Sequence, residues 1–333
     1  MFSNSGKAQE LPRCLNELGF AVDIVDHRNI GFYPHKKYDL FIGHEAANFE
    51  RIARALDAGT AIVYFATGLE WREHNRRQLL RLDEVKNRRG CSLRARMANP
   101  LEASSELADA IICVGQRAAE SFIGYGNVIG VDNAAFPVQW SGWQTKDYRA
   151  GRSSFLFFSG FGNVLKGLDL VLEAFAGTNL EVYICTAIEP DFARAFRREL
   201  TEFPNIHVEN WVVARSQHFE ELVSKCDWVI FPTCTEGQPG SVIECMAHGL
   251  LPIISSAANI ELPRGGIDIP RLDVEAVRTA ALQAIQMDPD EIEAAAKCLV
   301  RDSRIKYSPE TFRANFKSAI RQVFNQRRED IDL

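Results

Sequence analysis

The sequence lacks the features of several large protein classes. No apolar run approaches the roughly 18 residues that a membrane-spanning helix needs, and the opening residues MFSNSGKAQELPRC contain no apolar core typical of a secretory signal. None of the eight cysteines forms a C-x-x-C pair, which argues against a zinc ribbon or a thioredoxin-like redox centre. Cys113 and Cys185 lie in apolar runs, where cysteine acts as a small hydrophobe. We therefore expect a reduced, cytoplasmic protein.

No charge of one sign is in large excess. The 333 residues carry 38 Lys and Arg against 44 Asp and Glu, for a formal net charge of -6. We therefore expect no nucleic acid to bind over the whole surface. The share of hydrophobic residues, 46%, and of charged residues, 25%, is that of a globular protein. At roughly 100–200 residues per domain, the length predicts two domains.

Short apolar runs alternate with helical segments along the whole chain. Continuous apolar runs between helices predict parallel strands that are covered on both faces. Two α/β sheets in succession are the simplest interpretation. The expected strands lie at residues 20–25, 38–43, 61–66, 110–115 and 128–133 in the first half, and at 154–160, 181–187, 206–212, 228–234 and 251–257 in the second.

Residues 154–177 predict a strand, a glycine loop and a helix. Gly160 and Gly162 allow a ligand to approach the backbone, and the helix begins near Gly167. The free N–H groups and the dipole of a helix N-terminus favour an anion. Lys166 adds a point charge suited to phosphate. A glycine turn beside a solvated lysine is the alternative.

Two known phosphate-binding motifs do not fit this loop. A P-loop needs Lys directly after the second glycine, where Leu168 stands, and the dinucleotide fingerprint needs a third glycine where Leu165 stands. An NAD-dependent dehydrogenase, which would share the sheet pattern, therefore lacks its glycine signature.

Residues 228–256 are the most informative stretch. A buried strand leads into a polar glycine loop, a short helix from about Ser241 to His248, and the next buried strand. Ligands of open α/β sheets bind at the carboxyl ends of strands, where this loop lies. Glu236 and Glu244 can face one crevice there, and paired carboxylates suit ribose or sugar hydroxyls. A capping box, Ser241-x-x-Glu244, is the alternative explanation for Glu244.

Both stretches resemble the retaining glycosyltransferases of the GT-B fold, family-4-like (glycosyl transferases group 1). The resemblance is strong over residues 154–262 and weaker at 38–45 and 105–122. It rests on Ser159-Gly160, on Lys166-Gly167, on Glu236 and Glu244 with seven residues between them, and on the run AHGLLPII at 247–254.

The resemblance implies an α/β fold of two Rossmann-like parallel-sheet domains that face a cleft. We expect an N-terminal acceptor-side domain at 1–145 and a C-terminal nucleotide-sugar domain at 146–305, with the boundary in the polar stretch 137–153. A helix at 306–333, with Ser308 as its N-cap, carries an apolar stripe that covers its own domain or reaches back to the first.

The implied activity is sugar transfer from a nucleotide-sugar to a glycan, lipid-linked or small-molecule acceptor, with retention and with no cofactor and no catalytic metal. Lys166 would contact the donor diphosphate, Glu244 the ribose and Glu236 the donor sugar. The expected donor-binding residues are Gly160, Gly162, Lys166, Trp211, Val212, Glu236, Gly237, Gly240, Ser241, Val242 and Glu244.

His44 joins Glu236 and Lys166 as a candidate catalytic residue, because it ends an apolar run at the carboxyl end of an expected strand. A hydrogen-bonded structural histidine is the alternative. A sugar-nucleotide epimerase of the same fold, or an inactive protein that binds nucleotide-sugars, would show the same pattern.

The sequence departs from the family pattern in three places. Phe161 stands where the family has an arginine, so one phosphate-neutralising charge must come from elsewhere. Only five residues precede Gly6, and Lys7 onward predicts a helix, so the family's first strand is expected to be missing or to lie upstream. The usual histidine is not evident in residues 64–75.

Residues 71–97 are strongly basic, with eight arginines and one lysine against three acids. Two interpretations stay open. The segment is a solvated helical face, or it is a basic lip for an anionic acceptor or for peripheral contact with an acidic membrane surface.

Overall fold

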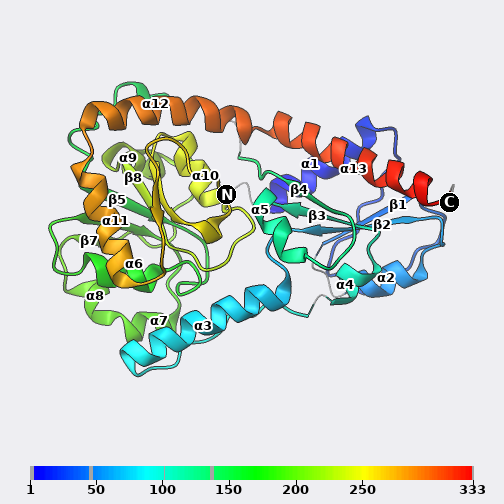
Figure 1. The fold of residues 1–333 in the computed structure, drawn as a ribbon, viewed down its shortest axis with the longest axis horizontal. Helices are drawn as coiled ribbons and strands as arrows, with labels where there is room; N and C mark the ends of the chain where they lie inside the picture. Colours follow the sequence, from blue (N-terminus) through cyan, green and yellow to red (C-terminus); the bar gives the residue numbers. More distant parts are fainter. Residues whose placement is uncertain (1–3, 45–47, 101, 136–138, 332–333) are drawn as a thin grey trace.

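The computed structural model describes residues 4–44, 48–100, 102–135 and 139–331. It contains two parallel sheets, each with its own helices and core, which lie side by side (Figure 1). The expected fold class, two Rossmann-like α/β domains, is therefore confirmed. Within the described residues, no helix is long and apolar enough to span a membrane.

The first domain is built on four parallel strands in the order β1-β2-β3-β4. Because consecutive strands are neighbours and crossovers are right-handed, the connecting helices cover one face. There Phe49 and Phe122 pack against Tyr64 and Ile111. The elements are α1 (Asn4–Glu17), β1 (Leu40–Gly43), α2 (Phe49–Ala55), β2 (Ala61–Ala66), α3 (Trp71–Arg89), α4 (Glu102–Leu107), β3 (Ala110–Val114), α5 (Gln116–Ala119), η1 (Glu120–Phe122), β4 (Val128–Val131) and η2 (Gly142–Gln144).

The opposite face of this sheet is covered by the two ends of the described chain. Helix α13 (Pro309–Ile331) leaves the second domain and lies beside α1 over the sheet (Figure 1). Its residues Phe312 and Phe316 are buried against Val63 and Ile112 of the strands. The hydroxyl of Ser308 accepts the N–H of Thr311 at 3.0 Å and caps the helix, as predicted. The C-terminal helix thus belongs to the core of the first domain.

The strand expected at residues 20–25 is absent. Residues 18–39 contain no helix or strand, and Ile24 is 74% exposed. Asp23 accepts a hydrogen bond from Tyr38 at 2.8 Å and pairs with Lys36 at 2.9 Å, so side chains rather than a ladder of backbone bonds hold the segment. An apolar run alone did not make a strand here, because this segment pairs with no strand of the sheet. The other nine expected strands are present, β2 with the expected bounds and the rest with shorter ones, whereas β10 was not expected.

The second domain has six parallel strands in the order β10-β9-β8-β5-β6-β7. The order reverses between β5 and β8, and such switch points are where open α/β sheets bind ligands. One large core fills this domain. Its elements are β5 (Ser154–Phe158), α6 (Leu168–Phe175), β6 (Glu181–Cys185), α7 (Pro190–Ala195), α8 (Arg197–Thr201), β7 (Ile206–Val208), α9 (Gln217–Lys225), β8 (Trp228–Phe231), α10 (Gly240–Ala247), β9 (Leu251–Ser255), η3 (Ser256–Ala258), β10 (Ile267–Ile269), α11 (Val274–Gln286) and α12 (Pro289–Lys306).

The basic helix α3 reaches from the first domain along the second (Figure 1). Arg81 and Arg88 both donate to Oδ2 of Asp169 in α6, each at 2.7 Å. Arg89 donates to Glu173 at 2.7 Å and to Glu199 at 2.8 Å. The far half of the helix is therefore an interdomain contact rather than a solvated face. Its acidic partners lie more than 80 residues away in the chain, so the sequence pattern does not reveal the pairing.

Candidate active site

The loop between β8 and α10 touches both domains. A Cβ atom on Gly237 would lie 2.3 Å from the carbonyl oxygen of Thr67 and 2.9 Å from that of Val114. Thr67 follows β2 and Val114 is the last residue of β3, so the loop lies directly on the carboxyl ends of these strands of the first sheet. Only glycine permits so close an approach of two backbones. The loop predicted to bind the donor is thus also the point where the domains meet.

Two side chains hold this loop in place, and neither was among the predicted site residues. The backbone N–H of Asn133 donates to Oε1 of Gln238 at 2.6 Å, and its side-chain amide donates to the Gln238 carbonyl at 2.7 Å. Both residues are buried. Because Asn133 follows β4, these bonds join the first sheet to the candidate site.

Lys166 and Glu236 form an ion pair in the cleft. They lie on the loops after β5 and β8, the two strands that flank the switch point. Gly167 has φ +79°, and a Cβ atom there would lie 2.1 Å from the carbonyl oxygen of Pro232. The glycine after the lysine therefore lets the two loops touch, which brings the predicted cation and carboxylate together.

Burial lowers the pKa of the Lys166 ammonium to about 7, and the guanidinium of Arg96 acts in the same direction. The interaction with Cys234 opposes this shift. An anionic ligand beside Lys166 would favour the charged ammonium, which burial disfavours.

Glu244 is buried in α10 and is not part of a capping box. The N-cap position of this helix is Pro239, and no side chain caps it by a hydrogen bond. Instead, Oε1 of Glu244 lies 3.5 Å from Nε of Arg215. That oxygen accepts no hydrogen bond from the described residues. The capping interpretation is therefore wrong, and a buried acceptor is left available to a ligand.

The pKa of Glu244 is raised by burial, and Arg215 opposes the shift. Arg215, on the segment between β7 and α9, is a partner that sequence reasoning missed. His248 donates from Nδ1 to the Glu244 carbonyl at 2.7 Å and thereby closes the last turn of α10.

The remaining predicted donor residues surround these groups. Val242 is fully buried in the core, so only its backbone amide can serve a ligand, together with those of Gly240 and Ser241 at the start of α10. Gly160 follows β5, and its carbonyl accepts the hydroxyl of Thr186 at 2.6 Å. Gly162 has φ +95°, a backbone conformation that favours glycine.

Trp211 lies at the outer edge of the candidate site. It is 50% exposed, and its ring centroid lies 6.0 Å from that of Phe161, which is 55% exposed. Val212 beside it is buried. Two neighbouring exposed aromatic rings form a surface on which a flat ligand group can stack.

Two histidines of the first domain lie near the carboxyl ends of its strands. His44, the predicted candidate, hydrogen-bonds through Nδ1 to the carbonyl of Phe65 at 2.8 Å. His74, in the first turn of α3, contacts the hydroxyl of Thr235 through Nδ1 at 3.2 Å. Burial lowers the pKa of His74, and Lys166 lowers it further. Of the two, His74 is the one that a described contact joins to the loop of Glu236, and it lies near enough to Lys166 to respond to its charge.

The second domain matches a known family. Residues 152–287 match the model for glycosyl transferases group 1. This domain belongs to that family. The match contains Lys166, Glu236 and Glu244. No curated protein matches the whole sequence significantly.

Solved structures share the fold of the glycosyl transferases group 1 domain and its partner domain. One is HepE from Anabaena in complex with UDP-glucose, 14% identical, with TM-score 0.61, over 86% of this chain and 79% of HepE. Sucrose-phosphate synthase from Thermosynechococcus elongatus is 17% identical, with TM-score 0.60, over 87% of this chain and 74% of that one. TarM from S. aureus is 13% identical, with TM-score 0.58, over 82% of this chain. The chain spans about half of TarM, 53%.

Proposed function

We propose that this protein is a retaining glycosyltransferase that moves a sugar from a nucleotide-sugar to a carbohydrate or lipid-linked acceptor. The observation that carries this proposal is the meeting of Lys166 and Glu236 at the switch point of the second sheet, beside the N-terminus of α10. Membership of the domain in glycosyl transferases group 1 supports the same activity.

The donor would lie on the second domain. Its diphosphate would accept hydrogen bonds from the amides at the start of α10 and take the charge of Lys166. The ribose hydroxyls would donate to the free oxygen of Glu244, and the base would lie near Trp211 and Val212. Because HepE is described in complex with UDP-glucose, a UDP-sugar is the first donor to test.

Chemistry would occur where the loop of Glu236 meets the first domain, which would supply the acceptor. Glu236 would hold sugar hydroxyls once the diphosphate replaces it as the partner of Lys166. In a same-face displacement, the leaving diphosphate takes the proton of the acceptor hydroxyl as the new glycosidic bond forms. The protein would then act by positioning both substrates and by stabilising the departing negative charge, without a catalytic metal ion.

A thermal-shift screen against UDP-, GDP- and ADP-sugars tests donor binding. One nucleotide class should stabilise the protein by about 2.7 kcal/mol at 100 times its dissociation constant. Product analysis by NMR should then show the anomeric configuration of the donor, and EDTA should leave turnover unchanged.

Four results would contradict parts of this proposal. If no nucleotide-sugar binds, the proposed function is wrong. A product of inverted configuration would contradict retention. Turnover that is lost with EDTA and restored by Mn²⁺ would contradict a mechanism without a catalytic metal ion. Turnover without an acceptor would point to an epimerase.

A further inference from the structure

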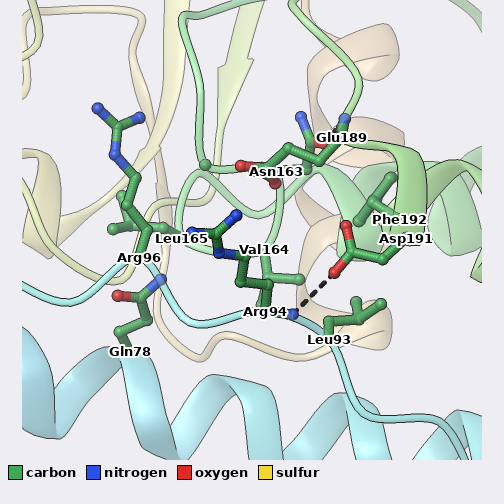
Figure 2. Close-up of a pocket in the computed structure, with 11 residues that line it drawn as sticks. Gln78, Leu93, Arg94, Arg96, Asn163, Val164, Leu165, Glu189, Asp191 and Phe192 are labelled. Carbon is green, nitrogen blue, oxygen red and sulfur yellow. Dashed lines mark hydrogen bonds between the residues drawn. The ribbon is translucent and has the colours of Figure 1, made fainter.

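The segment of residues 91–100 returns from the end of α3 to the first domain along the surface of the second. Three contacts fix its backbone. The amide of Gln78, in the orientation that satisfies both of its polar atoms, pairs with the N–H and the carbonyl of Arg96. The amide of Asn75 does the same for Ala98, at 2.7 and 3.0 Å. Asp191 of the second domain accepts the N–H of Arg94 at 2.8 Å (Figure 2). The side chain of Arg96 is therefore held at a defined place.

That place is the glycine loop after β5. The Arg96 guanidinium lies over the Phe161 ring, with its carbon 5.9 Å from the ring centroid. Its Nη1 atom lies 3.8 Å from the position that a Cβ atom on Gly162 would take. Arg96 is also near enough to Lys166 to lower the pKa of that ammonium. Two cations thus lie at one loop.

The charge around Arg96 differs from that around the arginines of α3. Every arginine of α3 has a carboxylate partner; these are Arg72, Arg76, Arg77, Arg81, Arg88 and Arg89. No carboxylate in the described part of the chain forms an ion pair with Arg96. Because Glu236 neutralises only one of these two cations, a ligand that brings negative charge would be favourable at this loop.

We propose that Arg96 binds the diphosphate of the nucleotide-sugar and supplies the charge that residue 161 does not. This inference rests on the proposed function. Phe161 supports the guanidinium by a cation–π contact instead of carrying a charge itself. Because Arg96 belongs to the connection between α3 and α4 of the first domain, a bound diphosphate would join residues of both domains.

Titration calorimetry with UDP and with uridine, which has no phosphate, tests this role. Arg96→Ala should weaken UDP binding by about 10- to 100-fold, as expected for a lost charge-assisted bond, and leave uridine binding unchanged. The matched control is Arg94→Ala, which removes the same charge from the same segment. Its guanidinium lies apart from that of Arg96 (Figure 2), and UDP affinity should stay within about twofold of the parent.

A second variant tests whether an arginine at position 161 can replace the arginine at position 96. In the Arg96→Ala background, Phe161→Arg should restore most of the lost UDP affinity, because the new guanidinium would reach the same loop from the second domain. Arg96→Gln, which keeps most of the side-chain stem, replaces Arg96→Ala if that variant melts at a lower temperature than the parent.

Each outcome separates this inference from the proposed function. If UDP binds the parent and Arg96→Ala equally well, the role of Arg96 is wrong and the proposed function stands. Equal losses for UDP and uridine would show a structural effect and would also overturn the inference. If the parent binds none of UDP, GDP, ADP and inorganic pyrophosphate, the inference fails together with the proposed function.

Discussion

Two clusters of charged side chains join the domains, and they differ in how evenly their positive and negative charges are matched. In the cluster between α3 and α6, Arg81 and Arg88 share Asp169, and Arg88 also pairs with Glu173. In the cleft, Lys166 pairs with Glu236 while Arg96 brings a second positive charge. A balanced cluster neutralises its own charges and holds the domains together. An unbalanced one keeps positive charge available for a ligand.

The clusters also differ in burial. The side chains of Arg81 and Asp169 are 3% and 0% exposed, whereas those of Lys166 and Glu236 are 18% and 15% exposed. A fully buried charge that loses its partner cannot recover solvation, so the balanced cluster should be sensitive to any single change. The cleft pair retains access to solvent and can exchange its internal partner for a ligand.

The largest effect is expected from Asp169→Asn. The substitution removes the buried carboxylate that Arg81 and Arg88 share and leaves Arg81 with Glu84 as its remaining carboxylate partner, which should lower the free energy of unfolding by about 3 kcal/mol. Urea denaturation measures the change. The control is Asp302→Asn, because Asp302 pairs with Arg301 on the surface and its loss should cost less than about 1 kcal/mol. A similar small change for Asp169→Asn would show that this cluster does not stabilise the fold.

Glu244→Gln should affect the donor more than the fold. In the proposed function Glu244 accepts a hydrogen bond from the ribose. Loss of this charge-assisted bond, worth about 1.5–3 kcal/mol, should lower donor affinity roughly 10- to 150-fold. Calorimetry with the nucleotide found in the screen measures it.

Lys166→Ala is the comparison for Glu244→Gln within the cleft. In the proposed function Lys166 faces the leaving diphosphate, so its loss should lower kcat as well as affinity, by on the order of a hundredfold. If both variants bind and turn over the donor as the parent does, the active site lies elsewhere.

The affinity for UDP should fall as pH rises above 7. The pKa of Lys166 is about 7 in the free protein, so the ammonium loses its proton above that pH, whereas a bound diphosphate favours the protonated form. Glu236, Arg96, His74 and Cys234 are the charged and titratable groups around it. The expected slope is at most about tenfold per pH unit.

Calorimetry between pH 7 and 9 measures this slope, because the range lies above the second ionisation of a phosphate, near about 6. Lys166→Arg should flatten the profile, since a guanidinium stays charged. A parent profile without slope would show that Lys166 does not change its charge when UDP binds.

The smallest effect is expected from Arg76→Ser. Arg76 is largely exposed and pairs with Glu73 one turn away, so stability should change by less than about 1 kcal/mol. The acceptor KM should also stay unchanged, because this charge is already matched within α3. A rise in KM at low salt that disappears at high salt would instead support a basic lip for the acceptor.

Local patterns in the sequence predicted much of the candidate site. Lys166, Glu236 and Glu244 each follow or precede a glycine loop next to a buried strand, and such short-range signals depend only on neighbouring residues. The same holds for the strands of both sheets and for the cap at Ser308. The run at 20–25 shows the limit of this reasoning, because a strand also needs a partner that the run itself cannot specify.

The tertiary structure decided which distant groups meet. Arg96 and His74 come to the Lys166 loop from the first domain, Arg215 comes to Glu244 from another loop, and Asp169 neutralises the basic helix α3 from a separate element. The sequence does not distinguish a carboxylate that caps a helix from one that pairs with an arginine or one that is available to bind a ligand. Its role depends on the charges within a few ångströms, since Coulomb interactions in a partly buried site fall off with distance in space rather than along the chain.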